Sequence, residues 1–292
     1  MATIRKAERR KAKLRLGISA PSGAGKTYSA LLMAFGLGGK IGMIDTEHGS
    51  GDLYADLGEY DIIGIGAPYT VAKYLDAIKS FEDAGYDTII IDSLSHAWAG
   101  EGGLLDKQGK IADSGRGNSY TAWRTVTPEH NALVDAMLKS PAHIIATMRA
   151  KTEYVIEKND KGKDQPRKVG MAPIQRDGME YEFTVMLDIA TDHTASASKD
   201  RTRLFDGLYF KPSQQTGLAL REWLEAGADA LSPPIDRKSA LLQTLQAASL
   251  NGLDALKAAF DAEPDDADRA EVWHEHSMTL KRAAKAAGEQ AA

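Results

Sequence analysis

The chain has 292 residues, a net charge of −5 and no cysteine. This length suits one large domain with a small appendage, and the missing cysteines exclude disulfides, thiolate metal sites and a cysteine nucleophile. No apolar run is long enough to span a bilayer, and the basic start lacks the apolar segment of a secretory signal. We therefore expect a cytoplasmic protein without membrane contact.

Basic residues are concentrated at the start of the chain. Residues 1–15 contain seven Lys or Arg side chains and one acidic residue, Glu8, so the remainder is acidic. A basic arm at residues 1–13 on an acidic body favours contact with phosphates or with an acidic neighbour. A solvated tail is the alternative interpretation.

Apolar runs alternate with helical patterns, which predicts a twisted, mostly parallel α/β sheet flanked by helices. The predicted strands are residues 14–19, 41–45, 61–65, 88–92 and 143–147. The predicted helices between them are residues 26–35, 71–84 and 120–139. The runs at 88–92 and 143–147 are continuously apolar, as in strands buried on both faces.

The pattern changes after Arg149. Residues 153–156 and 166–169 flank a polar turn, which predicts a β-hairpin or a flexible loop. Two more strands are predicted near residues 183–189 and 194–198, and a short helix at 216–226.

The segment Ser232-Pro233-Pro234 is the best candidate linker. We therefore expect a core at residues 14–230 and a small helical appendage at 236–292, where leucines recur at helical spacing.

The segment from Ala20 to Thr27, APSGAGKT, lies between the first predicted strand and helix. This is the order of a P-loop, with Ala20 in place of the usual first glycine. Lys26 would reach the terminal phosphates and the Thr27 hydroxyl would ligate Mg²⁺. The predicted nucleotide contacts are Ser22, Gly23, Ala24, Gly25, Lys26, Thr27 and Tyr28. An ordinary glycine-rich turn is the alternative, but it does not explain Lys and Thr after the second glycine.

Two acidic residues lie at or just after the ends of later predicted strands. Asp92 closes the run Thr88-Ile89-Ile90-Ile91, where we expect a Mg²⁺-linked carboxylate on the strand next to the P-loop strand. Glu47 follows the second strand and is the better candidate for the base that activates water, while Asp45 fixes the turn. A turn-capping Asp92 and a solvated Glu47 are the alternatives.

The segments IDTEHGSGDLYA and IIIDSLSHAW resemble the corresponding motifs of RecA and RadA recombinase ATPases. With IIATMRAKTEY, MAPIQRDGMEYEFTV and ASKDRTRLFDG, the pattern over about residues 4–210 resembles a family of phage-encoded RecA-fold ATPases used in single-strand annealing and recombination. The resemblance implies a RecA-like P-loop NTPase core that uses ATP and Mg²⁺.

The resemblance also implies roles for single residues. Tyr54 would stack on adenine, with a buried core tyrosine as the alternative. Lys199 and Arg201 would reach the nucleotide of a neighbouring copy, or else form a charged turn. One position departs from the family: RecA has a glutamine that links the γ-phosphate to the DNA-binding loop, and Thr147 is too short for that role. Arg149 or Gln175 is a candidate substitute.

In RecA-fold recombinases two loops face the DNA, and their counterparts are residues 100–119 and 149–175. The first is glycine-rich, and the second is basic in an otherwise acidic chain. Such loops can track a single-stranded backbone, with salt-dependent binding; a solvated hairpin is the alternative. The candidate DNA contacts are Lys107, Arg116, Arg149, Lys151, Lys161, Lys163, Arg167 and Lys168.

Together these patterns predict a Mg-ATP hydrolase that acts on single-stranded DNA by annealing or strand exchange. The expected partners are single-stranded DNA, further copies of the chain in a filament or ring, and a single-strand-binding protein. A slowly hydrolysing, nucleotide-gated loader and a small-molecule P-loop kinase are the alternative functions.

Overall fold

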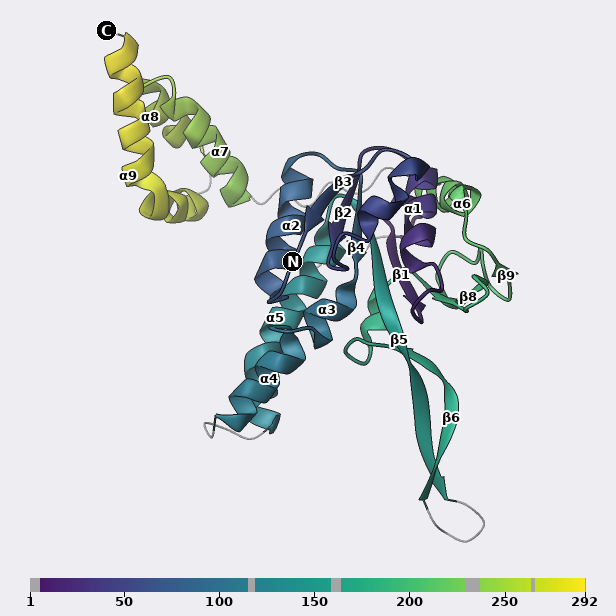
Figure 1. Cartoon of the computed structure of the whole chain (residues 1–292). Helices are drawn as coiled ribbons and strands as arrows, with labels where there is room; N and C mark the ends of the chain where they lie inside the picture. Colours follow the sequence, from purple (N-terminus) through teal and green to yellow (C-terminus); the bar gives the residue numbers. More distant parts are fainter. Residues whose placement is uncertain (1–5, 115–118, 159–163, 229–236, 264–265, 292) are drawn as a thin grey trace. The chain divides into compact units, whose positions relative to one another are not determined.

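A nine-stranded sheet organises the N-terminal compact unit, Met1–Ala228. The computed structural model describes residues 6–114, 119–158, 164–228, 237–263 and 266–291. Along the sheet the strands follow the order β3-β2-β4-β5-β1-β7-β8-β9, and β6 pairs with β5 (Figure 1). The strands are β1 Arg15–Ala20, β2 Ile41–Asp45, β3 Asp61–Gly64, β4 Thr88–Asp92, β5 His143–Lys158, β6 Asp164–Pro173, β7 Val185–Ile189, β8 Ala195–Asp200 and β9 Tyr209–Phe210.

The strands from β3 to β7 in this order pair in parallel, and β8 and β9 add an antiparallel edge. The expected mostly parallel sheet is therefore confirmed. One prediction is wrong: β4, which ends in Asp92, does not lie next to the P-loop strand β1. Strand β5 lies between them and pairs with both. Sequence order does not reveal an inserted strand that comes later in the chain.

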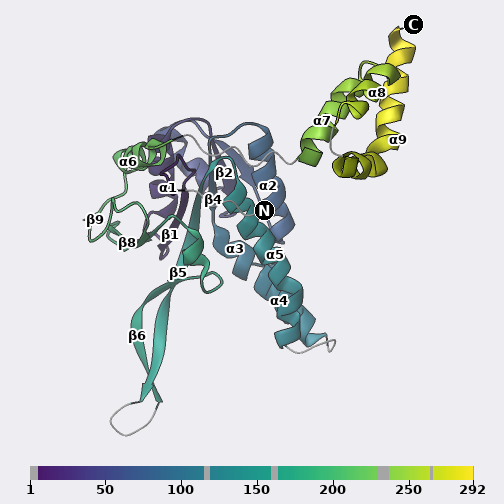
Figure 2. The ribbon, with the colours of Figure 1, turned by 180° about the vertical axis from the view of Figure 1, so that it is seen from behind.

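Helices cover both faces of the sheet (Figure 1 and Figure 2). Ile89 and Ile91 of β4 pack in the core beneath α2, α3 and α5, whereas Ile90 faces the core beneath α1 and α6. This alternation explains the unbroken apolar run, because both faces of a central parallel strand are buried. The helices are α1 Lys26–Leu37, α2 Val71–Asp83, α3 Leu94–Ala99, α4 Leu104–Asp113, α5 Ser119–Lys139 and α6 Gln214–Glu225, with short 3₁₀ helices η1 Gly51–Leu57 and η2 Met179–Glu182.

The first predicted DNA loop, residues 100–119, is helical over half of its length. Residues Leu104–Asp113 form helix α4, which packs on α5. Leu104 is buried, and Lys110 pairs with Asp106 one turn earlier, with 2.7 Å between nitrogen and oxygen. The glycines suggested a loop, but the buried leucine and the i,i+4 ion pair favour a helix.

The end of the basic segment is anchored to the core. The Arg15 guanidinium is buried and donates to the carbonyl oxygens of Ala142, at 2.8 Å, and Leu138, at 3.0 Å, and it thereby satisfies groups at the end of α5. Burial lowers the Arg15 pKa to about 10. The guanidinium carbon of Arg9 lies 4.6 Å from the ring centroid of Trp223, and the same guanidinium donates to the Trp223 carbonyl oxygen. These two charges are therefore used within the molecule, and the arm offers fewer free cations than its composition suggests.

His143 joins the starts of β5 and β1, because its Nδ1 accepts a 2.9 Å hydrogen bond from the backbone of Leu14. Burial, with help from Lys13 and Arg15, lowers its pKa to about 4, and Asp87 opposes the shift weakly. Between the folded pKa and the unfolded value of about 6.5 the unfolded chain binds the extra proton, so stability falls as pH falls through this window.

We therefore expect acidification from pH 7 to pH 5 to cost the wild type about 2 kcal/mol of unfolding free energy more than His143→Asn. The asparagine oxygen can still accept from Leu14 but does not titrate. Urea unfolding at the two pH values measures the difference. An equal loss in both proteins would show that His143 does not carry this pH dependence.

The described residues of the C-terminal compact unit, Asp229–Ala292, include three helices. They are α7 Arg237–Ser249, α8 Leu253–Asp261 and α9 Asp266–Ala291. Leu241, Leu245, Leu256, Val272 and Leu280 form its buried core. The expected C-terminal helices are thus present, while the predicted linker at Ser232 lies outside the described residues.

Candidate nucleotide site

The loop between β1 and α1 has a backbone suited to phosphate. Gly23 and Gly25 have φ of 77° and 86°, a left-handed conformation that side chains disfavour. Because these two glycines alternate with residues of ordinary backbone conformation, successive amide N–H groups can form an anion-binding nest at the start of α1. Ala20, which replaces the usual first glycine, is the last residue of β1 and is buried in extended backbone. A methyl group fits there, so this departure leaves the loop intact.

Lys26 is the first residue of α1, and its side chain folds back over the loop. Its Nζ donates to the carbonyl oxygens of Pro21, at 3.1 Å, and Ala20, at 3.3 Å. Burial lowers its pKa, and the negative charges of Asp92 and Glu47 counteract the shift. The ammonium group is therefore held across the mouth of the loop, next to two carboxylates.

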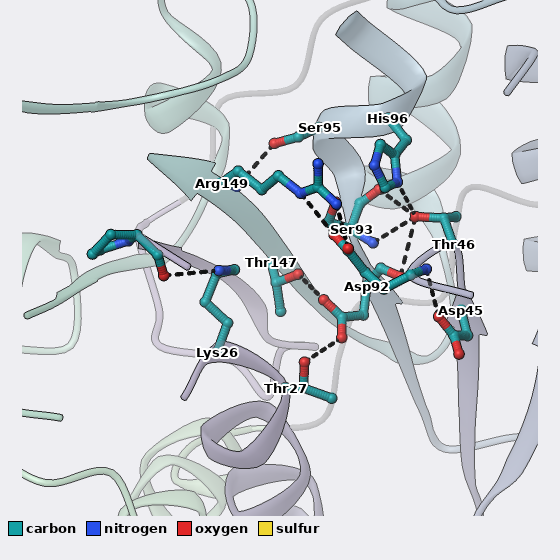
Figure 3. Close-up of polar contacts among 12 residues, drawn as sticks. Lys26, Thr27, Asp45, Thr46, Asp92, Ser93, Ser95, His96, Thr147 and Arg149 are labelled. Atoms are coloured by element: carbon teal, nitrogen blue, oxygen red, sulfur yellow. Dashed lines mark hydrogen bonds and ion pairs between the residues drawn. The ribbon is translucent and has the colours of Figure 1, made fainter. Parts of the chain in front are cut away.

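Asp92 is buried at the end of β4, and its side chain bonds to residues of α1 and β5. Its Oδ2 accepts from the Thr27 hydroxyl at 2.5 Å, and its Oδ1 accepts from the Thr147 hydroxyl on β5 (Figure 3). Burial raises its pKa, and the two hydroxyls lower it in part. Thr147, at the position of the missing glutamine, thus serves to hold Asp92.

The oxygen atoms of Thr27 and Asp92 suit a hard cation such as Mg²⁺. In the described part of the chain no three His, Cys, Asp or Glu side chains gather to hold a metal ion. Mg²⁺ commonly takes one or two protein ligands and completes its shell with phosphate and water. Nearby, the buried Ser50 hydroxyl has no hydrogen-bond partner within the described residues. It lines a hollow together with Thr27 and Asp92. These groups fit a nucleotide-bound Mg²⁺.

Glu47 lies in the turn after β2. Its side chain points toward Arg149, which follows Thr147 along β5. The Arg149 Nε donates to Glu47 Oε1 at 2.9 Å, and a terminal guanidinium nitrogen pairs with Oε2. Burial raises the Glu47 pKa, but Arg149 outweighs burial and the net shift is downward. Asp45 accepts from the backbone N–H groups of Glu47, at 2.6 Å, and Gly51, at 3.2 Å, so it fixes the turn.

Two hollows meet at the P-loop. One, of about 520 Å³, is lined by Ser22, Gly23, Lys26, Thr27, Glu47, Ser50, Asp92, Arg149, Ala150 and Ile174. The other, of about 470 Å³, is lined by Gly23, Gly25, Lys26, Thr27, Tyr28, Ser29, Tyr54, His193, Lys211 and Pro212. A larger hollow near β2 and β3, of about 650 Å³, contains no P-loop residue. The lining of the 520 Å³ hollow suits phosphates and metal, and the lining of the 470 Å³ hollow suits a nucleoside.

The nucleoside-sized hollow contains both expected aromatic residues and three that the sequence did not indicate. The rings of Tyr28 and Tyr54 meet edge to face, with 5.9 Å between centroids. Opposite them, His193 Nδ1 lies 3.1 Å from the Ala24 carbonyl oxygen, and Lys211 and Pro212 complete the wall. His193 has a φ of 69°, which is uncommon outside glycine and often marks functional turns.

Lys199 and Arg201 do not reach the P-loop of their own chain. Lys199 donates to the carbonyl oxygen of Glu180 at 3.1 Å, and both residues contact the carbonyl oxygen of Tyr181 in η2. Action on the nucleotide of a neighbouring copy remains a prediction for this pair.

The predicted DNA contacts fall in different surroundings. Lys107 lies on α4 and pairs with Glu129 of α5, so it does not lie on a loop. Arg149 turns toward Glu47, whereas Lys151 on β5 is exposed. Arg116, Lys161 and Lys163 lie outside the described residues, and Arg167 and Lys168 belong to β6, where only the backbone is described. Of the two candidate substitutes for the missing glutamine, Arg149 lines the phosphate hollow and Gln175 is buried, donating to the Leu94 carbonyl at 3.3 Å.

A glycine-bearing loop on β1, a buried strand-end carboxylate beside its threonine, and a mostly parallel sheet between helix layers define the fold of a P-loop NTPase. The chain belongs to the AAA domain family, because the family model matches residues 12–216. This match spans the sheet and both helix layers and excludes the C-terminal unit.

Comparison with curated proteins finds no match. Among solved structures, a crystal structure of the RadB recombinase is similar, with 16% sequence identity and a TM-score of 0.36 over 70% of this chain and 90% of that chain. In the described part of the chain, no helix has the length and apolar character needed to cross a membrane.

Proposed function

We propose that the protein binds and hydrolyses Mg-ATP and couples hydrolysis to single-stranded DNA, in annealing or strand exchange of the phage recombination type. The observation that carries this proposal is the meeting of Lys26, the Thr27–Asp92 pair and Glu47 around one hollow next to a nucleoside-sized one. This shared lining supports a proposal in which the first three residues bind a triphosphate and Glu47 acts on a water molecule.

In this proposal the P-loop amides and Lys26 bind the β- and γ-phosphates, and Thr27 and Asp92 hold Mg²⁺. When bound, Mg²⁺ neutralises charge on the phosphate oxygens. Glu47 orients a water molecule in line with the γ-phosphate and accepts its proton, and Lys26 stabilises the charge that develops on the transferred group. Tyr28 and Tyr54 contact the base, and Lys199 and Arg201 of a neighbouring copy supply further cations.

The β5–β6 hairpin connects this site to the proposed DNA-binding region. Its first pair is Ala150 with Pro173, and the backbone N–H of Ile174 donates to the Arg149 carbonyl at 2.6 Å. Ala150 and Ile174 also line the phosphate hollow. From this root the hairpin extends away from the sheet (Figure 1), and its sequence carries the basic residues from Lys151 to Lys168. A single strand of DNA bound along the hairpin would thus be coupled to the nucleotide site through a short backbone connection.

Single-stranded DNA is expected to stimulate ATP hydrolysis without any phosphate acceptor, and simultaneous reversal of Lys161, Lys163, Arg167 and Lys168 to Glu is expected to remove the stimulation. Phosphate contacts dominate such binding, so the difference in DNA affinity between the wild type and this variant should be largest at low salt. Phosphate release and DNA retention on a filter measure the two effects.

As a matched control, Lys79, Lys139, Lys257 and Arg282 are reversed to Glu, which changes net charge equally at exposed positions elsewhere. Equal DNA retention by both variants would dismiss the hairpin. ADP formation that requires a small-molecule acceptor to take up the phosphoryl group would favour the kinase, and nucleotide-dependent assembly without DNA stimulation would favour the loader.

A further inference from the structure

We infer that Arg149 is a positioning residue that occupies Glu47 while the site is empty and transfers to the γ-phosphate when ATP binds, which frees Glu47 for the attacking water. This inference rests on the proposed function, in which Glu47 is the base and the hollow holds phosphate. It assigns Arg149 a role inside the nucleotide site in place of the DNA contact expected from the sequence.

The contact is a two-point one that uses both carboxylate oxygens of Glu47. The Glu47 side chain is 21% exposed and the Arg149 side chain 44% exposed, so the carboxylate is the more enclosed partner. The Arg149 backbone is fixed on both sides: its N–H donates to the Ser95 hydroxyl at 2.9 Å, and its carbonyl accepts from Ile174. A change of partner therefore requires only rotation of the arginine side chain.

A carboxylate engaged in this way is a poor base. Both oxygens that would accept a proton from water already accept N–H groups of the guanidinium. The same contact lowers the Glu47 pKa, which further weakens its tendency to take up a proton. The paired arrangement therefore suits a resting site, and hydrolysis requires the pair to open.

The phosphate hollow provides the competing anion. Arg149 and Lys26 both line it, and a guanidinium binds phosphate oxygens by the same two-point geometry that it uses with a carboxylate. The other charged groups near Glu47 do not replace Arg149. Lys26 is bound to loop carbonyls, and His96 has its pKa lowered by burial and by Arg149, while its Nδ1 lies 2.7 Å from the Thr46 hydroxyl. Asp92, the other nearby anion, is engaged by two hydroxyls. Transfer of Arg149 thus leaves Glu47 unpaired next to the reacting phosphate.

A thermodynamic cycle in the intact protein tests this exchange. Wild type, Glu47→Gln, Arg149→Gln and the double variant are titrated with ADP and with a slowly hydrolysed ATP analogue in a calorimeter. Glu47→Gln should bind the ATP analogue several-fold more tightly and ADP unchanged, because the neutral amide competes less well for Arg149. Arg149→Gln should lose about tenfold in affinity for the ATP analogue only, as expected for one charged contact. Arg149→Lys should recover part of this loss.

The double variant separates exchange from simple repulsion between Glu47 and the phosphate. If Arg149 is the shared cation, Glu47→Gln gains less than about twofold once Arg149 is absent. An equal or larger gain without Arg149, or no gain in either background, would overturn the inference. Arg176→Gln, an arginine that lies over Trp123, serves as the matched control and should bind both nucleotides as the wild type does.

The pH profiles give a second readout that a merely structural role would not move. The acid limb of kcat/KM reports the free enzyme and that of kcat reports the ATP complex. Arg149→Gln should raise the pKa of the first limb, where the pair exists, and leave the second in place, where it has already opened. A shift of both limbs would show that the pair persists during catalysis, and a shift of neither would show that it does not act on Glu47. Loss of the proposed function itself would show differently, as full turnover by Glu47→Gln.

Discussion

Replacement of Lys26 by Ala is expected to abolish detectable binding of ATP. In the proposed function Lys26 donates charged hydrogen bonds to the β- and γ-phosphates, and each such bond contributes about 1.5–3 kcal/mol. Two of them correspond to a loss of roughly a hundredfold or more in affinity. The ammonium group is already partly desolvated and is held at the mouth of the loop by Pro21 and Ala20, so little reorganisation is needed when phosphate binds.

Titration calorimetry with ATP, with far-ultraviolet circular dichroism as a check on folding, measures this effect. Lys40→Ala is the matched control, because Lys40 lies over the ring of Tyr86, away from the loop. A folded Lys26→Ala protein that still binds ATP at near wild-type affinity would contradict the placement of the phosphates on this loop.

The second large effect concerns turnover. Glu47→Gln is expected to slow ATP hydrolysis by roughly 10²–10⁴-fold, the contribution of a positioned general base. The amide keeps the size and much of the hydrogen bonding of the carboxylate, so the turn that Asp45 fixes should persist and ATP should remain bound. The loss would therefore fall on kcat and not on nucleotide affinity.

Single-turnover phosphate release under saturating ATP isolates this step. Glu59→Gln, a change on the loop between η1 and β3, is the corresponding control at a carboxylate that lines a different hollow. If the Glu47 variant hydrolyses ATP within a few-fold of the wild type, another group activates the water, and the proposed mechanism is wrong.

Much of the core could be predicted from local patterns. Strands β2 and β4 begin and end at the predicted residues, because an apolar run bounded by polar turns specifies a buried strand. The P-loop motif likewise specifies its own geometry, since the two glycines set the backbone that the phosphates need. The polar turn between residues 153–156 and 166–169 predicts a β-hairpin or a flexible loop, and the segment forms the paired strands β5 and β6. The patterns of β2, β4 and the P-loop each act within a few residues.

The errors arose where distant segments meet. The resemblance implies a glycine-rich loop at residues 100–119, but packing of α4 on α5 and the ion pair between Lys107 and Glu129 stabilise a helix within it. Arg149 is a sequence candidate both for DNA contact and for the role of the missing glutamine, and in the structure it binds a carboxylate that lies 102 residues earlier in the chain. His193 approaches the P-loop across 169 residues, and no local signal marks it.

The amino-acid sequence alone was enough to specify the alternation of strands and helices, the phosphate loop with Lys26 and Thr27, and the strand-end acids Asp92 and Glu47. These depend on side-chain periodicity and backbone preference, which act over one turn or one strand. The insertion of β5 between β1 and β4, the joining of Thr27 to Asp92, and the Arg149–Glu47 pair depended on the folded sheet. Parallel strands gather their carboxyl ends at one edge, and only the order of the strands decides which side chains meet there.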